Sequence, residues 1–284
     1  MYKLVVDSCC DITEDMKTWQ NFEIVPLVLS VGDYSVLDDE NFDQDDFIGR
    51  IVKTGTLGKS ACPSPDAFAK AIEGDYDEVY LMTITDKLSG SYNSAVNGVE
   101  LYRESHSDNK KIHVFNSLST SGTETIMAHK IKELADAGTP FDDVISTVED
   151  YCVNHNGLFF CLESLDALKG NGRLFNLGAK VIETLRVKLI CERTDYGNIT
   201  VAGKDFNQNR AFGKMAKLVA DRTEGRDLKG ETCIVSHVCC KEKAQHVADL
   251  ILAECNFGRM IVQKASGLNS LYASNGGIIV SYSY

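Results

Sequence analysis

The sequence is poor in proline and tryptophan and has no long apolar run. Its 284 residues include 4 prolines and 1 tryptophan, so no proline-rich spacer separates parts of the chain. No uninterrupted apolar segment approaches the roughly 20 residues that a membrane-spanning helix needs. The apolar start of the chain is too short for a signal peptide and ends at Asp7. We therefore expect no stable membrane anchor and a cytoplasmic location.

Positive charge and paired cysteines are also lacking. The chain has 29 Lys and Arg against 41 Asp and Glu, a net charge of −12, which disfavours binding to nucleic acid. None of the 10 cysteines forms a Cys-x-x-Cys pair, so structural zinc is disfavoured and buried, reduced thiols are expected. His237 lies close to Cys239 and Cys240 but has no second ligand cluster. We predict neither a metal site nor a cofactor.

Apolar, strand-like runs alternate with helix-like runs in the first half of the chain. The predicted strands are residues 2–7, 23–30, 78–84 and 111–115. The predicted helices are residues 43–52, 65–73, 92–103, 123–137 and 141–152. This alternation predicts a parallel sheet with crossover helices, in which ligands collect beyond the carboxyl ends of the strands.

The second half of the chain has a less regular order of elements. Its predicted strands are residues 158–162, 187–191, 199–202, 232–236, 260–265 and 277–282, and its predicted helices are residues 164–169, 211–223 and 244–255. A turn-rich break at residues 154–157 separates the halves. We predict an α/β protein with two domains: an N-terminal parallel-sheet domain (residues 1–155) that carries the binding loops, and a C-terminal mixed-sheet domain (residues 156–284). The ligand is expected between or beneath them.

Two serine-containing loops are the candidate binding site. Ser89 lies between a strand and a helix, where helix N–H groups attract an anion, although Ser89 or Ser91 can equally act as a helix cap. Ser60 precedes a helix whose expected N-cap is Ser64. If Ser60 and Ser89 face one point, two helix N-termini converge on one anion. The Gly-x-Ser-x-Gly elbow of many hydrolases is absent from the Ser89 loop.

Several segments together resemble the DegV family, the fatty-acid-binding subunits of the bacterial fatty-acid kinase, over nearly the whole chain. The segments are residues 5–8 (Val-Val-Asp-Ser), 59–65 (Lys-Ser-Ala-Cys-Pro-Ser-Pro), 87–95 (Lys-Leu-Ser-Gly-Ser-Tyr-Asn-Ser-Ala), 165–174 (Leu-Asp-Ala-Leu-Lys-Gly-Asn-Gly-Arg-Leu) and 187–190 (Val-Lys-Leu-Ile). They occur in the family's order.

The resemblance implies a carrier without catalytic residues that binds a long-chain fatty acid in a buried tunnel. In the family, a threonine and a serine hydroxyl hold the carboxylate, and these positions are Ser60 and Ser89 here. A separate ATP-binding kinase subunit then converts the acid to an acyl phosphate. Ser91 and Tyr272 are expected to support the head group, and Tyr272 replaces a family histidine. The family arginine expected before the helix at 211–223 falls near Phe206.

Two other functions fit the same loops. One is an enzyme that acts on a small carboxylated or phosphorylated metabolite, which would need a general base that none of the 6 histidines supplies at a recognisable spacing. The other is a carrier of a different apolar acid, such as a sterol or a retinoid.

Overall fold

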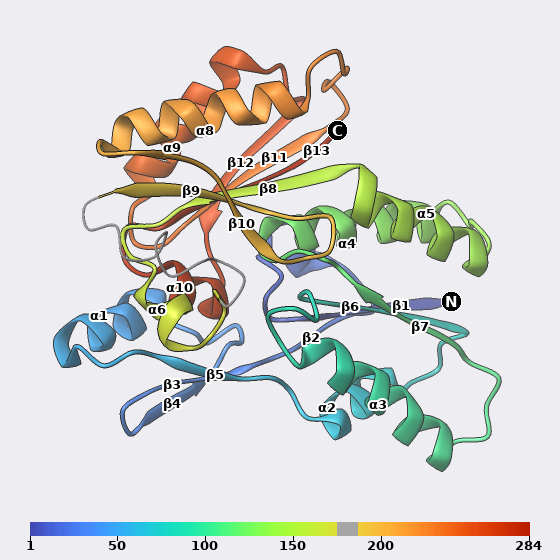
Figure 1. The fold of residues 1–284 in the computed structure, drawn as a ribbon. Helices are drawn as coiled ribbons and strands as arrows, with labels where there is room; N and C mark the ends of the chain where they lie inside the picture. Colours follow the sequence, from blue (N-terminus) through green and yellow to red (C-terminus); the bar gives the residue numbers. More distant parts are fainter. Residues whose placement is uncertain (175–186) are drawn as a thin grey trace.

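The computed structural model describes residues 1–174 and 187–284. Within them the strands form a 4-stranded, a 6-stranded and a 3-stranded sheet, and Figure 1 shows the two larger sheets on opposite sides of a central layer that contains α4 (Gly122–Asp136). None of the helices in the described ranges is long and apolar enough to cross a membrane.

The 4-stranded sheet is parallel, as predicted. Its order is β2 (Phe22–Val25), β1 (Tyr2–Asp7), β6 (Glu78–Thr83) and β7 (Lys111–Asn116). Two helices, α2 (Pro65–Ile72) and α3 (Ser91–Ser105), cover one face, and α4 and α5 (Phe141–Asn154) cover the other. Alternate residues of β1 and β6 therefore enter two different cores.

The 6-stranded sheet is mixed, which also agrees with the prediction. Its order is β10 (Ile199–Asp205), β9 (Lys188–Arg193), β8 (Asn156–Cys161), β13 (Ile278–Ser283), β11 (Thr232–His237) and β12 (Arg259–Lys264). Only the β11–β12 pair is parallel among these strands. The helices α8 (Gln208–Arg222) and α9 (Lys241–Glu254) cover its outer face. Its inner face is turned toward the N-terminal half (Figure 1).

The 3-stranded sheet was not predicted. The expected strand at residues 23–30 is two strands, β2 and β3 (Val28–Val31), separated at Pro26, because proline has no N–H to donate to a sheet ladder. β3 pairs with β4 (Tyr34–Leu37) and β5 (Lys59–Ala61). The short helix η1 (Met16–Thr18) was also missed.

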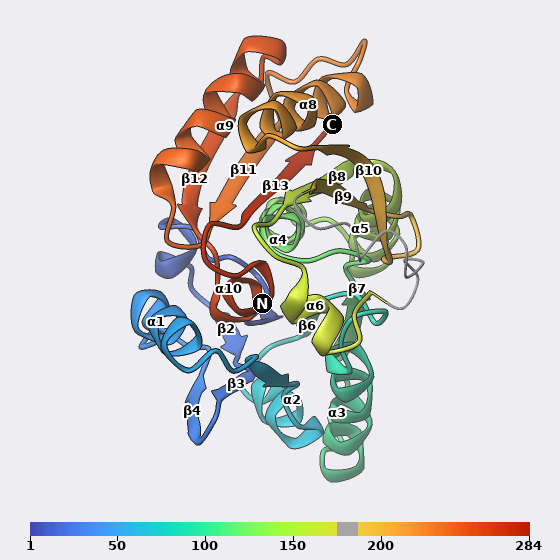
Figure 2. The ribbon, with the colours of Figure 1, turned by 60° about the vertical axis from the view of Figure 1, so that its left-hand side comes forward.

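The two halves share packing across the predicted boundary. β8, the first strand of the 6-stranded sheet, begins two residues after α5 ends. However, α10 (Gly267–Ala273) from the C-terminal half packs into a core with Leu29, Phe47 and Ile84 of the N-terminal half. Figure 2 shows α10 and α6 (Asp166–Gly170) in the middle of the molecule, between the 6-stranded sheet and the helices α2 and α3. The boundary near residue 155 remains a prediction.

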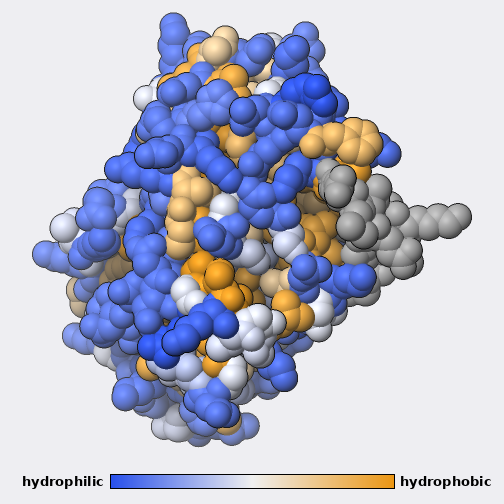
Figure 3. Space-filling view, turned by 90° about the vertical axis from the view of Figure 1, so that its left-hand side faces the viewer, coloured by the Kyte–Doolittle hydropathy of each residue, from blue (hydrophilic) through white to orange (hydrophobic). Residues whose placement is uncertain are grey.

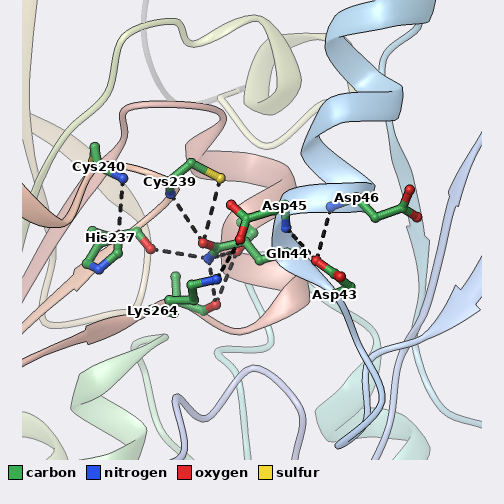
Figure 4. Close-up of polar contacts among 10 residues, drawn as sticks. Asp43, Gln44, Asp45, Asp46, His237, Cys239, Cys240 and Lys264 are labelled. Carbon is green, nitrogen blue, oxygen red and sulfur yellow. Dashed lines mark hydrogen bonds and ion pairs between the residues drawn. The ribbon is translucent and has the colours of Figure 1, made fainter.

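Gln44 joins the halves through a set of buried hydrogen bonds (Figure 4). It lies at the start of α1 (Gln44–Thr54), and its Nε2 donates to the carbonyl oxygens of His237 (3.2 Å) and Ala265 (3.0 Å). Its Oε1 accepts from the backbone N–H of Cys239 at 3.2 Å. One amide side chain thus satisfies backbone groups at the ends of β11 and β12.

We expect Gln44→Ala to lower the free energy of unfolding by about 1–3 kcal/mol, because the Cys239 N–H loses its acceptor and the carbonyl oxygens of His237 and Ala265 each lose one donor. Chemical denaturation measures this change. The matched control is Asp46→Ala on the same helix, which removes an exposed ion pair with Arg50 and should have a much smaller effect. Equal losses in the two variants would contradict the bridging role of Gln44.

Candidate functional site

A cavity lies between the inner face of the 6-stranded sheet and the loops of the N-terminal half. It spans about 780 Å³, including space that is open to solvent. The loops after β6 and β7, together with α6 and α10, form one wall, and β8, β9, β10 and β13 contribute to the other. Figure 3 shows hydrophobic residues gathered in the middle of one face of the molecule, between hydrophilic upper and lower parts.

The apolar wall follows from the alternation of side chains along β8. Leu158, Phe160 and Leu162 line the cavity, whereas Phe159 points into the core under α8 and α9. Both faces of this strand are buried, as expected for a central strand with a continuous apolar sequence. Ile279 on the neighbouring strand β13 extends the same wall.

The polar end of the cavity contains Ser60, Ser89 and Tyr272, and all three line it. Ser60 lies on β5, and its Oγ is 3.0 Å from the Tyr272 hydroxyl on α10. Ser89 lies in the loop before α3, where its Oγ accepts a hydrogen bond from the Ser91 N–H at 3.2 Å. A Cβ atom at the adjacent Gly90 would lie 3.3 Å from the sulfur of Cys62, so these two segments are in contact.

These contacts leave hydroxyl protons available to a ligand. Ser89 uses its oxygen as an acceptor, so its O–H can still donate. In the pair formed by Ser60 and Tyr272, one O–H proton makes the mutual bond and the other is free. These hydroxyl groups line the cavity, and Ser89 directly precedes α3, whose first N–H groups have no partner within their own helix. The arrangement suits an anionic group.

Arg173 provides positive charge next to these hydroxyls. Its guanidinium carbon lies 5.6 Å from the centre of the Tyr272 ring, and its Nε donates to the carbonyl of Leu88 at 3.2 Å. Asn171, two residues earlier, donates to the carbonyl of Gly58 at 3.0 Å. These two hydrogen bonds hold the segment after α6 against the loops that carry Ser60 and Ser89.

The Asp38 carboxylate determines where Tyr272 lies, because it holds the start of α10. It accepts hydrogen bonds from the N–H groups of Gly267 (2.7 Å) and Leu268 (2.8 Å), and from the Ser8 hydroxyl (2.9 Å). Burial raises the pKa of Asp38 to about 7, although these hydrogen bonds act in the opposite direction.

A second buried carboxylate, Asp11, holds the same segment. It accepts from the Ser266 N–H at 2.7 Å and from Asn269 Nδ2 at 2.8 Å. Asn269 also donates to the carbonyl of Cys9 at 2.7 Å. Two acids of the N-terminal half thus position a helix of the C-terminal half.

Ser91 lies away from the cavity wall. It is fully buried at the start of α3, and its hydroxyl lowers the pKa of the neighbouring Asp7, which burial raises to about 6. Any support that Ser91 gives to a head group is therefore indirect, through the bond between its N–H and Ser89. Ser60 also differs from the expectation of a loop at a helix start: it lies in a strand, and Ser64 caps α2 by accepting from the Ala67 N–H at 3.2 Å.

One cluster of side chains in the described ranges has the spacing of metal ligands: Asp7, Cys9 and Glu124. Asp7 and Cys9 already have protein partners, whereas both carboxyl oxygens of Glu124 are buried without a hydrogen-bond partner among the described residues. Asp7 accepts from the N–H groups of Cys9 and Ile84, each at 3.1 Å. Burial and the Asp7 charge raise the pKa of Glu124 well above its usual range. His237 and Cys239, considered above, are also engaged, because His237 Nδ1 accepts from the Cys240 N–H (3.4 Å) and the Cys239 thiol donates to Gln44 (3.7 Å), as Figure 4 shows.

Sequence reasoning missed other polar residues of the cavity, namely Thr85, Ser119, Thr120, Arg193, Asn198 and Asn269. They come from distant loops and strand ends. Arg193 carried a weak signal, because it continues the alternation of Leu189 and Cys191 on a strand whose inner face is otherwise apolar.

Fold and site together define a class: a two-sheet α/β protein with an apolar cavity between its halves and hydroxyl donors at one end. The model of the family described as "Uncharacterised protein, DegV family COG1307" matches residues 1–283. A DegV domain-containing protein of Streptococcus gordonii is 32% identical over 283 residues, which cover 99% of this chain and 98% of the relative. The chain belongs to the DegV family.

Solved structures with this fold include proteins crystallised with fatty acids. The chain is similar to a DegV family protein of Ruminococcus gnavus with vaccenic acid (TM-score 0.92, 35% identity, 99% and 98% coverage of the two chains). It is similar to a DegV family protein of Eubacterium eligens loaded with heptadecanoic acid (TM-score 0.88, 31% identity, 99% of each chain). It is also similar to the Streptococcus pneumoniae Fatty Acid Kinase (Fak) B3 protein loaded with linoleic acid (TM-score 0.87, 29% identity, 99% of each chain).

We expect Asp38→Asn to change how stability depends on pH. A carboxyl whose pKa is raised by folding binds more protons in the native state, so its contribution to stability is largest below about pH 4 and is lost as the pH rises to about 7. The difference in unfolding free energy between wild type and Asp38→Asn should therefore fall over this range, by at most about 1.4 kcal/mol per pH unit. Urea denaturation at several pH values measures it, and a difference that rises with pH would contradict the assignment.

Proposed function

We propose that this protein binds a long-chain fatty acid in the cavity, with the carboxylate at Ser60 and Ser89 and the tail along Leu158, Phe160 and Leu162. The observation that carries the proposal is the pairing of an apolar wall with hydroxyl donors at one end. The described lining contains hydroxyls, amides and two guanidinium groups, but no carboxylate or imidazole. A lining of this kind suits a ligand that is itself a carboxylate.

Relatives support the same ligand class. The R. gnavus, E. eligens and S. pneumoniae proteins described above are similar over nearly the whole chain, and they hold vaccenic, heptadecanoic and linoleic acid respectively. These acids differ in length and unsaturation but share one head group. The carboxylate is thus the common element that the serine loops would recognise.

The energetics are consistent with a buried tail and a head group held without an ion pair. Burial contributes about 0.8 kcal/mol per methylene, so roughly fourteen methylenes contribute about 11 kcal/mol before the entropic costs of binding. A buried carboxylate without hydrogen-bond partners would reduce this binding free energy by several kcal/mol. The hydroxyl of Ser89 and one hydroxyl of the pair formed by Ser60 and Tyr272, with the positive end of α3, offset that cost.

The protein would then present the acid to a separate kinase subunit that binds ATP. The similarity to the Fatty Acid Kinase (Fak) B3 protein supports this role. In the reaction, the γ-phosphoryl group of ATP moves to a carboxylate oxygen and ADP leaves. This chain would contribute the oriented carboxylate rather than a catalytic residue.

We expect Ser60→Ala and Ser89→Ala each to weaken binding of oleic acid about tenfold, because each removes a hydrogen bond to a charged group. Titration calorimetry or competition with a fluorescent fatty acid measures the affinity. Ser105→Ala, at the exposed end of α3, is the matched control and should leave it unchanged. A Ser89→Ala protein with full affinity would overturn the proposed head-group site.

The kinase role predicts that acyl phosphate forms only when this protein, the fatty acid, ATP and the ATP-binding subunit of a fatty-acid kinase are mixed. Hydroxylamine trapping of the acyl phosphate measures the product. Product formation by this chain with the fatty acid and ATP, without a kinase subunit, would identify an enzyme instead. Failure of every tested kinase subunit, with fatty-acid binding intact, would remove the kinase role and leave the binding role.

A further inference from the structure

Arg193 is a charged residue on the apolar wall of the cavity. It is the last residue of β9, and the antiparallel register that pairs Phe159 with Glu192 places it beside Leu158 of β8. Arg193 lines the cavity, as do Leu158 and Phe160 on the same face of the sheet. A guanidinium group here faces a space otherwise suited to a hydrocarbon chain.

Part of this guanidinium group has no hydrogen-bond partner. Nη2 donates to the carbonyl oxygens of Asn156 (2.7 Å) and Val153 (3.4 Å), near the C-terminal end of α5. Nε and Nη1 are enclosed and have no partner, and Arg193 forms no ion pair with any described residue. Loss of solvent at this position also lowers the pKa of Arg193. Buried donors without acceptors are costly, so a ligand that brings an acceptor gains more here than at an apolar wall.

Arg193 lies opposite the start of β8, whereas the end of this strand leads toward α6. Leu162 leads into α6, and Asn171 beyond that helix donates to the carbonyl of Gly58, two residues before Ser60. Leu158 is four residues back along β8, which is about 13 Å at the rise of a β-strand. A fatty acid whose carboxylate is at the serines would therefore place the middle or far part of its chain near Arg193.

We propose, on the basis of the function proposed above, that the cavity prefers fatty acids with an oxygen acceptor on the chain, a hydroxyl or an oxo group, and that Arg193 Nε and Nη1 recognise this oxygen. Arg193 is thus a specificity-determining residue rather than part of the head-group site. The carboxylate binds at Ser60 and Ser89, and the oxygen on the chain accepts hydrogen bonds from Arg193 Nε and Nη1, which have no acceptor among the described residues.

The test compares stearic acid with a series of hydroxystearic acids in which the hydroxyl moves along the chain. Wild-type protein should bind at least one positional isomer about tenfold more tightly than stearic acid. Arg193→Met should lose this preference and keep its affinity for stearic acid within about threefold. Arg222→Met is the matched control, because Arg222 pairs with the neighbouring Glu192 (2.8 Å) and does not line the cavity; it should keep the preference.

Each other outcome is decisive. Equal wild-type affinity for all the acids would overturn the inference while leaving fatty-acid binding intact, whereas failure to bind stearic acid at all would overturn the proposed function itself. Loss of stearic acid binding in Arg193→Met would place the carboxylate at Arg193 and overturn the inference. A lower melting temperature with an unchanged preference would show that Arg193 only caps α5. If Arg193→Met does not fold, Arg193→Lys keeps the charge but alters the donor geometry, and an unchanged preference in that variant would also refute the inference.

Discussion

The attachment of α10 to the N-terminal half through buried carboxylates is the constraint on which the cavity depends. Asp38 and Asp11 accept hydrogen bonds from the backbone and side chains at the start of this helix. Because α10 is held there, Tyr272 meets Ser60, and Leu268 becomes part of the cavity wall. A helix from one half of the chain thus completes a binding site on loops of the other half.

The two walls of the cavity contribute different kinds of side chain. The 6-stranded sheet supplies apolar side chains through the simple alternation of β8, and the N-terminal loops supply hydroxyl groups at the ends of parallel strands and helices. Neutral hydroxyl donors can bind a carboxylate without the strong desolvation cost that a fully buried ion pair would add. The two arginines of the described cavity lining lie at different places. Arg173 is next to the hydroxyl groups, and Arg193 is on the 6-stranded sheet.

Much of this architecture could be predicted from local sequence patterns. The strands at 78–84 and 158–162 are mostly apolar runs and the helix after Ser89 has apolar residues at helical spacing; the structure confirms them as β6, β8 and α3. The prediction took no account of Pro26, which interrupts an apolar run, so it gave one strand where the chain forms two. β5 is only three residues long, and its pairing with β3 depends on contacts distant in sequence. Local patterns carry no information on such pairing.

The same limit applies to the candidate site, because local patterns do not reveal residues whose role depends on contacts distant in sequence. Ser60 and Ser89 could be chosen by their loops and by the family resemblance, and the structure brings both to one cavity with Tyr272. Arg193 had only a weak sequence signal, because its significance comes from the absence of hydrogen-bond partners for Nε and Nη1 among the described residues of the folded chain. The same holds for Asp38, whose partners lie 229 and 230 residues away in the chain.

A crystal structure of the protein with bound oleic acid tests the central claim most directly. The account predicts a carboxylate within hydrogen-bonding distance of Ser60 Oγ and Ser89 Oγ, with the tail against Leu158 and Phe160. A carboxylate bound at another place in the cavity, or an acid bound outside it, would contradict the account.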